Sequence, residues 1–476
     1  MNYYRSGKSE TWRFPALLTF ILFCLLFIDS SLAYGLSLEQ EEKMGQQFAF
    51  QVRKQLDLVD DEFAHQYINS LGQYLIRPLK TKPFPFRFYN VKHNALNAFA
   101  GPGGHIYVFS GLVEAVDTLD ELVAVLCHEI GHVSARHIAA RFEQNKKIGM
   151  ASMVGVLAGV VVGVAGGGSG AGFGVAAGSL AAGRQAQLNY SRVAERQADQ
   201  ISFKLMQPTG FNPGGMIGAL TKISQSSWVG SGSVPTYLLT HPAGTERMSN
   251  FDSMLTNYTQ PPKGKEAAMF TAYFPYFQTI MRARCHDPQQ AEKVFLREMD
   301  EDPKSFLPHF GLALIYKQKV DFDKAEYHFY KAIEKKRDFP PLLTSLGKLH
   351  QLQGEYEAAI PCYEKALKIE DKNRETLFLL GESYRHLEEY EKSVVVFERL
   401  VNLKPVKTEV FQQLGIAYGR QDKLALAHYN FGIYFKRLRD AKKARFHFEK
   451  AQKLVGDDSV LRGNIRKELE GIPIVR

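Results

Sequence analysis

Residues 126–132 of this 476-residue chain read Leu-Cys-His-Glu-Ile-Gly-His, and the pattern around them predicts a buried helix. Apolar residues recur there at helical spacing, at Leu122, Val123, Leu126 and Ile130. With this period His128 and His132 lie on one helix face, and their imidazoles converge on one point. Two such imidazoles are typical zinc ligands, with Glu129 beside them as a general base. The alternative is a buried helix with two chance histidines.

A catalytic zinc site takes three protein ligands, so the motif predicts one more ligand elsewhere in the chain. Metzincins would supply a histidine six residues after His132, behind a glycine, but the chain has Ile138 and Ala135 at these places. A later helical stretch puts Glu195 and Asp199 four residues apart on one face. Glu195 is the predicted third ligand, and Asp199 is predicted to accept the spare N–H of a ligating histidine. Solvated surface charges are the alternative.

The full set of motifs resembles the M48 peptidases, in particular the periplasmic members of that family. The motifs are His128-Glu129-x-x-His132, Ser191-Arg192 with Glu195-x-x-Ala198-Asp199, and His241-Pro242 with Glu246-Arg247. Residues 97–108 are also similar to the strand pair that precedes the zinc helix in the family. The chain departs from the family at Gln197, where a glutamate is usual. His137 is expected to cap or support the helix rather than to bind metal.

The resemblance implies an α+β zincin-like metalloprotease domain over residues 36–262, mostly helical with a small β-sheet, holding one Zn²⁺ per chain. It further implies that His241 enters the open zinc position in a resting state, or stabilises the oxyanion in a working one. Arg247 would add positive charge nearby. The implied work is quality control of outer-membrane β-barrel proteins, with the C-terminal repeats docking on the outer-membrane assembly machinery.

Strands are predicted just before the zinc helix. Residues 86–91 and 105–109 alternate in hydropathy, and residues 101–104 form a glycine-rich turn between Asn97-Ala98-Phe99 and the later strand. An exposed edge at Asn97, Ala98 and Phe99 would let an extended substrate peptide add as another strand. An ordinary structural hairpin is the alternative. Two helices are expected upstream, between residues 38 and 78.

The N-terminal residues read as a secretory signal. Three basic residues, Arg5, Lys8 and Arg13, precede an uncharged run over residues 14–28, and Ser31-Leu32-Ala33 provides a cleavage site. We expect residues 1–33 to be removed, with an uncleaved anchor as the alternative. In a Gram-negative host this predicts export across the inner membrane to the periplasm, where association with the outer membrane is compatible with the signal.

The amino-acid composition further restricts the class of protein and the partners that it can bind. The chain is 45% hydrophobic and 23% charged, which is typical of globular protein. Its net charge of +9 is spread along the chain without a basic stripe and interleaved aromatics, so we expect no nucleic-acid partner. Peripheral contact with an anionic membrane surface is compatible with this charge. After the signal three cysteines remain, so at most one disulfide can form, and Cys285 with Cys362 is the pair considered.

Residues 148–183 are apolar, rich in glycine and alanine, and free of charge. A hydrophobic hairpin lying over the active-site cleft as a mobile lid is the preferred interpretation. A membrane-dipping or membrane-spanning pair of helices, and plain core helices joined by a loose loop, are the alternatives.

From residue 269 to residue 476 the sequence repeats every 34 residues, which predicts an all-α tetratricopeptide solenoid. The three tracks in register are Ala313, Gly347, Gly381 and Gly415; Ala325, Ala359, Ser393 and Ala427; and Phe329, Tyr363, Phe397 and Phe431. Small residues let paired helices approach, and the aromatics are expected to fill the groove between repeats. Ala291 and Phe295 predict a degenerate cap upstream. Gly432 and Ala444 imply that the helix through Phe431 also begins a partial final repeat.

Two functions from different classes fit these patterns. One is a zinc-dependent metalloendopeptidase of the cell envelope that degrades unfolded or misassembled outer-membrane proteins and assists their assembly through its repeats. The other is a chaperone or scaffold that binds partners through the repeats and keeps its zinc site closed with His241.

Overall fold

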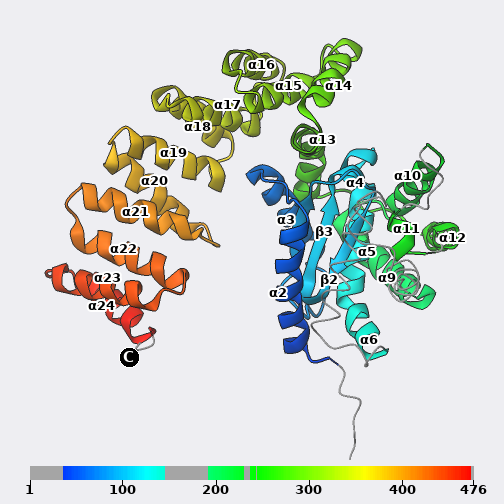
Figure 1. Ribbon diagram of the computed structural model, residues 1–476, viewed down its shortest axis with the longest axis horizontal. Coiled ribbons are helices and arrows are strands. Elements are labelled where there is room, and N and C mark those ends of the chain that lie inside the picture. Colours follow the sequence, from blue (N-terminus) through cyan, green and yellow to red (C-terminus); the bar gives the residue numbers. More distant parts are fainter. Residues whose placement is uncertain (1–35, 145–190, 230–235, 243, 473–476) are drawn as a thin grey trace, which may run out of the picture. The chain divides into compact units, whose positions relative to one another are not determined.

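The chain forms two compact units, which the computed structural model describes over residues 36–144, 191–229, 236–242 and 244–472 (Figure 1). The first unit comprises the residues up to Leu58 together with Tyr67–Phe270, and the second comprises Val59–Gln66 and Thr271–Arg476. The predicted signal over residues 1–33 and the predicted lid over residues 148–183 lie outside the described residues. Within the described ranges, none of the helices combines the length and the apolar character that crossing a membrane requires.

A three-stranded sheet organises the first unit, in the order β1-β3-β2. Strand β3 (His105–Phe109) runs parallel to β1 (Arg87–Val91) and antiparallel to β2 (Ala98–Gly101). The short helix η1 (Pro102–Gly104) makes the turn from β2 to β3, where Gly103 and Gly104 adopt φ values of 69° and 83°. Such values favour glycine, which accounts for the glycine-rich turn predicted from the sequence.

Helices cover the sheet and close one of its edges. Helix α2 (Leu38–Gln55) begins at a capping box between Ser37 and Gln40, and its Phe48 packs edge-on against Phe99 and Tyr107 of the sheet. Helix α3 (Glu62–Leu75) binds the backbone of β1: the Asn69 amide donates to the Phe88 carbonyl at 2.9 Å and accepts from its N–H at 3.2 Å. This edge of the sheet is therefore occupied by side chains.

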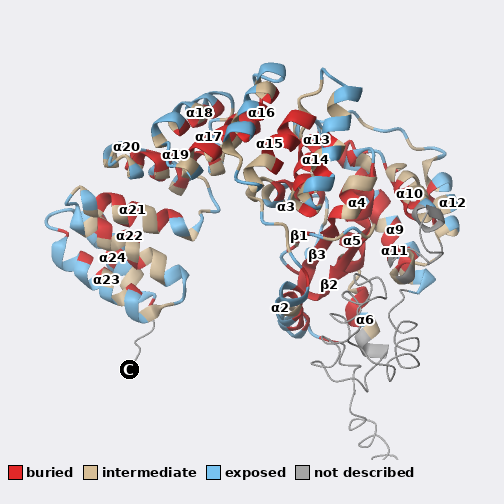
Figure 2. Cartoon of the chain, turned by 45° about the horizontal axis from the view of Figure 1, so that its top comes forward, coloured by how far each residue is buried: buried red, intermediate tan, exposed pale blue. Residues whose placement is uncertain are grey.

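The helix that carries the metal motif, α5 (Leu119–Ser134), is capped by Thr118 and buried along almost its whole length (Figure 2). It packs against α9 and α10 and against β2. The other elements of this unit are α4 (Ser110–Ala115), α6 (His137–Gln144), α9 (Arg192–Met206), η3 (Gln207–Thr209), α10 (Gly215–Val229), α11 (Thr236–Thr240) and α12 (Gly244–Leu255). The result is the predicted class, a mostly helical domain with a small sheet.

Paired helices make up the second unit. They are α13 (Lys265–Cys285), which begins in the first unit, α14 (Pro288–Glu301), α15 (Leu307–Gln318), α16 (Phe322–Lys335), α17 (Pro340–Gln353), α18 (Tyr356–Ile369), α19 (Arg374–His386), α20 (Tyr390–Asn402), α21 (Thr408–Arg420), α22 (Leu424–Arg437), α23 (Ala441–Leu454) and α24 (Ser459–Glu470). From α14 to α24 consecutive helices pack against each other, which confirms the predicted solenoid.

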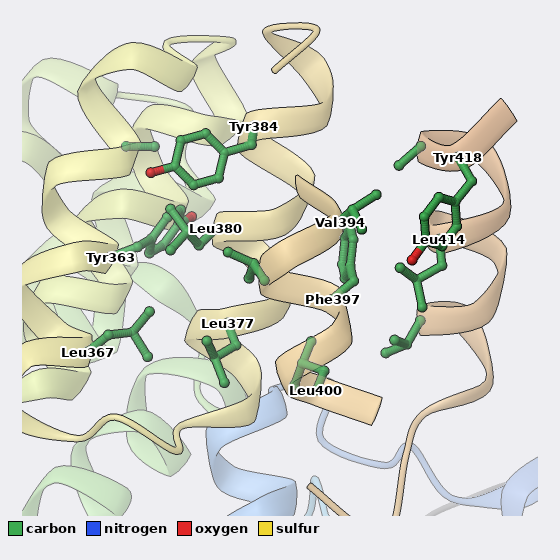
Figure 3. Packing of buried hydrophobic residues seen from close by; sticks show 14 of the residues in the cluster. Tyr363, Leu367, Leu377, Leu380, Tyr384, Val394, Phe397, Leu400, Leu414 and Tyr418 are labelled. Carbon is green, nitrogen blue, oxygen red and sulfur yellow. The ribbon is translucent and has the colours of Figure 1, made fainter. Parts of the chain in front are cut away.

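Residues of the aromatic track, Tyr363 and Phe397 among them, lie in the buried core between the helices (Figure 3). A Cβ added at Gly347 of α17 would lie 2.5 Å from the ring of Tyr363 of α18, and one added at Gly381 would lie 2.8 Å from the ring of Phe397. The aromatic rings therefore pack on the glycine of their own repeat, whereas the sequence analysis placed them in the groove between repeats. Only glycine lets the ring come this close. As predicted, α22 packs on both α21 and α23, and Gly432 lies under the ring of Phe448.

We expect Gly347→Ala to destabilise the repeat unit by about 1–3 kcal/mol, because the new methyl group overlaps a fully buried ring. Gly463→Ala in α24 is the matched control, since a Cβ there meets nothing within 4 Å and alanine favours helix. Urea unfolding followed by circular dichroism measures both variants. Equal midpoints for the two would contradict the packing described.

No disulfide joins the cysteines of the described residues, which are Cys127, Cys285 and Cys362. Cys127 is fully buried in α5, where burial raises the pKa of its thiol. Cys285 ends α13 and Cys362 lies in α18, and they are not joined. The disulfide considered for this pair is therefore not formed.

Candidate metal centre

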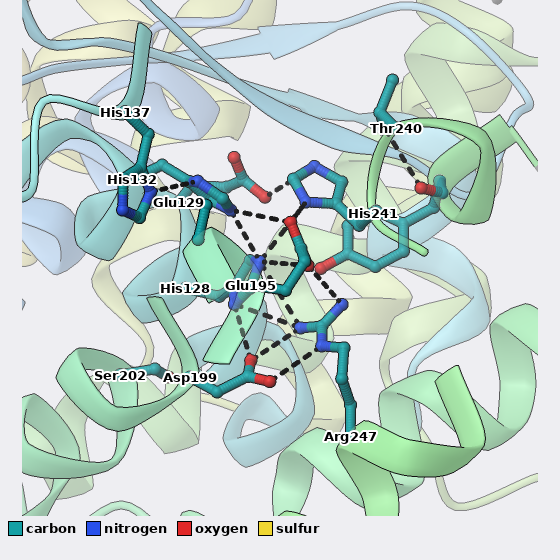
Figure 4. Close-up of polar contacts among 12 residues, drawn as sticks. His128, Glu129, His132, His137, Glu195, Asp199, Ser202, Thr240, His241 and Arg247 are labelled. Atoms are coloured by element: carbon teal, nitrogen blue, oxygen red, sulfur yellow. Dashed lines mark hydrogen bonds and ion pairs between the residues drawn. The ribbon is translucent and has the colours of Figure 1, made fainter. Parts of the chain in front are cut away.

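Two histidines of α5 and a glutamate of α9 meet inside the first unit (Figure 4). His128 Nε2 and His132 Nε2 are 3.0 Å apart, and each lies 3.4 Å from a carboxylate oxygen of Glu195. The two helices approach closely because position 131 is glycine: a Cβ there would lie 2.8 Å from the Ala198 carbonyl oxygen. A fourth donor comes from the chain just after α11, where His241 Nδ1 lies 3.1 Å from Glu195 Oε1.

The four donor atoms fit a zinc ion. His128, His132, Glu195 and His241 are all buried, and their candidate ligand atoms lie within 4.8 Å of one another. The close pairs are separated by 3.0–3.4 Å. Zinc bonds to nitrogen and oxygen of about 2.0–2.1 Å in a tetrahedron separate neighbouring ligand atoms by about 3.3 Å.

The charge of the cluster also fits a divalent cation. Three buried carboxylates, those of Glu129, Glu195 and Asp199, face one buried cation, the guanidinium of Arg247. With neutral imidazoles this leaves a net charge of −2 within a nearly solvent-free volume. An uncompensated charge of this size is costly to bury, and a zinc ion would balance it.

Glu129 carries a carboxylate without a hydrogen-bond partner among the described residues. Its Oε1 lies 3.5 Å from His241 Nε2, and the side chain is 0% exposed. Burial raises the pKa of this carboxyl group above its ordinary value. A buried, proton-accepting group next to the cluster is what a general base requires.

His128 is oriented by an acid that is itself held by Arg247. Its Nδ1 lies 2.8 Å from Asp199 Oδ1, so an N–H there donates to the carboxylate and Nε2 keeps its lone pair for the cluster. Arg247 donates to both Asp199 oxygens, at 2.8 and 2.9 Å, and Nη1 lies 3.1 Å from Glu195 Oε2. Although burial opposes it, Arg247 and His128 hold the pKa of Asp199 below its ordinary value.

Two neutral side chains, His137 and Gln197, orient His132 through a relay of two hydrogen bonds. Its Nδ1 lies 2.8 Å from His137 Nδ1, and His137 Nε2 lies 3.1 Å from Gln197 Oε1. When His132 Nε2 points a lone pair at the cluster, Nδ1 carries the proton and donates it to His137, which in turn donates to Gln197. Burial lowers the pKa of His137, which favours this neutral form. Gln197, the departure from the M48 pattern, thus acts on a ligand through His137.

We expect His137→Ala to weaken zinc binding by about 10–100-fold, because the tautomer and ring orientation of His132 are then no longer fixed. Competition with a chromophoric chelator measures this affinity without any turnover. His386→Ala, a change at an exposed histidine of the repeats, is the control and should bind zinc as the unchanged chain does. Equal affinities for the two variants would show that the relay has no such role.

The structure places the remaining predicted residues near this centre. Asn97 precedes β2, and Ala98 and Phe99 lie in β2, which packs against α5. All three residues are buried, so the exposed edge predicted for them is wrong. Tyr237, which the sequence did not single out, stacks on His241 with ring centroids 4.5 Å apart, and its carbonyl accepts the His241 N–H at 2.8 Å. Its position four residues before His241 on a helix is the only sequence signal for this contact.

Fold and site together define a mostly helical domain with an H-E-x-x-H helix and a buried cluster of candidate metal ligands, followed by a solenoid of paired helices. Residues 63–255 match Peptidase family M48, and residues 340–373 and 375–407 match the tetratricopeptide repeat. The chain contains an M48 peptidase domain followed by tetratricopeptide repeats.

Several curated proteins are similar to this chain. The Beta-barrel assembly-enhancing protease of Yersinia pestis is 35% identical over 224 residues, which is 47% of this chain and 45% of that protein. The protein of the same name from Escherichia coli (strain K12) is 33% identical over 223 residues, with the same coverage of each chain. Metalloprotease LoiP of Escherichia coli (strain K12) is 26% identical, over 45% of this chain and 80% of that protein. The matched region spans less than half of the first two relatives.

Among solved structures, the crystal structure of MamA protein matches 36% of this chain and 90% of its own, at 17% sequence identity and a TM-score of 0.29.

Proposed function

We propose that the protein is a zinc-dependent metalloendopeptidase. The observation that carries this proposal is the buried set of four converging donor atoms, with the Glu129 carboxylate, which accepts no hydrogen bond from the described residues, beside it. His128, His132 and Glu195 would hold the metal, while Asp199 and Arg247 fix the orientation of His128. The M48 match over residues 63–255 supports the same assignment.

Different residues of the chain would contribute to different steps of peptide-bond hydrolysis. Bound zinc would supply Lewis-acid activation of water and of the scissile carbonyl. Glu129 would accept a proton from the attacking water and return it to the leaving amine, and burial, which raises its pKa, makes it a better proton acceptor than an exposed carboxylate. His241, whose Nδ1 occupies the fourth donor position, would close the site in the resting protein and would have to leave before a substrate could bind.

The substrate would bind as an extended strand beside β2. Asn69 already occupies backbone groups of β1, and among the described strands β2 has no neighbour on its outer side. Outward-facing main-chain groups of Ala98 would hold peptides of many sequences, which suits unfolded or misassembled proteins. Asn97 and Phe99 would flank this position, and the Asn97 carbonyl already accepts the Phe109 N–H of β3.

We further infer a place in the cell envelope. The relatives are named for β-barrel assembly, which supports a periplasmic protein that degrades misassembled outer-membrane proteins and contacts their assembly machinery through its repeats. A second candidate, a chaperone or scaffold with a closed zinc site, is favoured by the position of His241 alone.

His241→Ala decides between these candidates. If His241 restrains the enzyme, its removal should raise casein cleavage at least tenfold, which corresponds to a closed state favoured by about 1.4 kcal/mol. If His241 instead stabilises the oxyanion, cleavage should fall by about 10²–10³-fold. Metal content is measured in parallel. One zinc per chain with no cleavage in either form would favour the scaffold function.

A further inference from the structure

The repeat unit holds a peptide segment that does not belong to the repeats. Residues 59–66 read Val-Asp-Asp-Glu-Phe-Ala-His-Gln and precede the metallopeptidase sheet in sequence, yet they form part of the second unit. They include the first five residues of α3, whose remaining residues belong to the first unit. The contacts of this segment show what chemistry the repeats recognise.

The acidic residues of the segment pair with basic residues of the repeat unit. Asp61 Oδ2 lies 3.2 Å from Arg284 Nη2 of α13, and the Asp61 side chain is only 9% exposed. Glu62 Oε1 lies 2.6 Å from Lys407 Nζ, at the start of α21. Two adjacent carboxylates are thus bound by cations from distant parts of the repeat sequence.

The aromatic residue of the segment enters a group of aromatic rings. Phe63 packs edge-to-face on Tyr276, with centroids 4.7 Å apart, and also meets Tyr273 at 6.1 Å. Tyr276 is in turn stacked on Phe310 of α15 at 4.2 Å. Such contacts add to the free energy of burying the ring and favour an aromatic residue at this position.

A cavity of about 30 Å³ beside Asp61 and Phe63 has an excess of positive charge. Its lining includes the cations Arg284, Lys317 and Lys348 and the carboxylates of Asp61 and Glu375. Asp61 pairs with Arg284, and Glu375 pairs with Lys348. Among the described residues no carboxylate pairs with Lys317. Burial, together with the two neighbouring cations, lowers the pKa of Lys317 to about 8.

An unpaired cation in such a place is costly for a purely structural contact, because a neutral side chain would fill the same volume without the penalty. The cation is useful if the carboxylate that it binds comes from another molecule. The cations are also presented by successive alternate helices, Arg284 by α13, Lys317 by α15 and Lys348 by α17, as is usual for a binding face of a helical solenoid.

We propose that the face formed by α13, α15, α17 and α19 binds an acidic peptide of a partner protein, with an aromatic residue next to its carboxylates. Residues 59–66 are the resident occupant that such a peptide displaces. Lys317 offers the incoming peptide one ion pair that the resident segment does not make, because the exposed Asp60 carboxylate can turn toward Lys317 in a peptide that the chain does not hold at both ends. This inference deepens the part of the proposed function in which the repeats contact a partner, and it rests on that part alone, because neither the metal nor peptide cleavage enters it.

The test uses the full chain and a fluorescein-labelled peptide of residues 57–66, with binding followed by fluorescence anisotropy. The double variant Asp61→Asn, Phe63→Ala weakens the resident segment and should bind the peptide at least tenfold more tightly than the unchanged chain. Lys317→Gln keeps the resident segment and should weaken binding about fivefold, the loss of roughly 1 kcal/mol for one ion pair. Lys372→Gln, the same charge change at an exposed lysine, should leave the affinity as it is.

Thermal unfolding of each variant shows that it is folded. Lys317→Gln should fold at least as well as the unchanged chain, so it tests the proposal even if the double variant is unstable. The proposal is overturned if the double variant gains no affinity, if Lys317→Gln binds as Lys372→Gln does, or if a scrambled peptide of the same composition binds equally well.

Discussion

Glu129→Gln should lower kcat/KM for casein about 10³-fold or more while the protein keeps its metal. The amide has the shape of the carboxylate, and neither Glu129 oxygen makes a hydrogen bond to a described residue, so the substitution disturbs no packing. Among the described residues beside the cluster, it removes the only buried carboxyl group whose pKa is raised. General bases contribute about 10²–10⁴-fold, and no other described acid close to the donors is free of ligand or orienting contacts.

A fluorescent casein assay and metal analysis of the same samples measure this result. Glu39→Gln is the control, because Glu39 is an exposed acid in the first turn of α2. Cleavage within tenfold of that of the unchanged protein would exclude Glu129 as the base. Loss of zinc together with activity would instead give Glu129 a part in holding the metal.

Glu195→Ala should remove the metal. A residue that only orients a ligand changes metal affinity by about 10–100-fold, and the loss of a ligand should exceed this range. The substitution also takes one negative charge from the cluster and leaves Arg247 Nη1 without its carboxylate at 3.1 Å. The positive field at the two α5 histidines then rises, which further disfavours a cation.

Metal content after dialysis against a weak chelator, and the affinity from competition, measure this effect. Glu246→Ala is the matched control, since Glu246 lies at the surface and pairs with Arg196 on the outer side of α9. One tightly bound zinc per chain in Glu195→Ala would show that Glu195 is not a ligand. A folded protein with unchanged circular dichroism is needed for either reading.

The sequence predicts the parts of this site that depend on local periodicity. The helical period alone brings His128 next to His132 and sets Glu195 and Asp199 on one face, so these pairings need no tertiary knowledge. The hairpin of β2 and β3 was predicted for the same reason, because its turn is short and needs glycine at positive φ.

The remaining features depend on contacts between distant segments. The parallel pairing of β1 with β3 follows from how the chain crosses the sheet, and no pattern in either strand reports it. The docking of residues 59–66 in the repeat unit depends on Arg284 and Lys407, more than 200 residues away in sequence. The aromatic track was found by its period, but its ring positions were wrong, because the period does not say which neighbour a ring meets.

The seating of each ring on a glycine of its own repeat bears on how the array can evolve. A duplicated block of 34 residues contains both residues of the contact. Gly347 and Tyr363 would therefore be copied together, and the new repeat would already contain the glycine that its aromatic ring packs against. The C-terminal end lacks this freedom. In helix α22, Phe431 packs on α21 and Gly432 accepts the ring of Phe448 from α23. Copying or losing the segment that encodes α22 would therefore break one of these two packing contacts. The solenoid can therefore lengthen by duplication of an internal 34-residue repeat, but not by duplication of α22 alone.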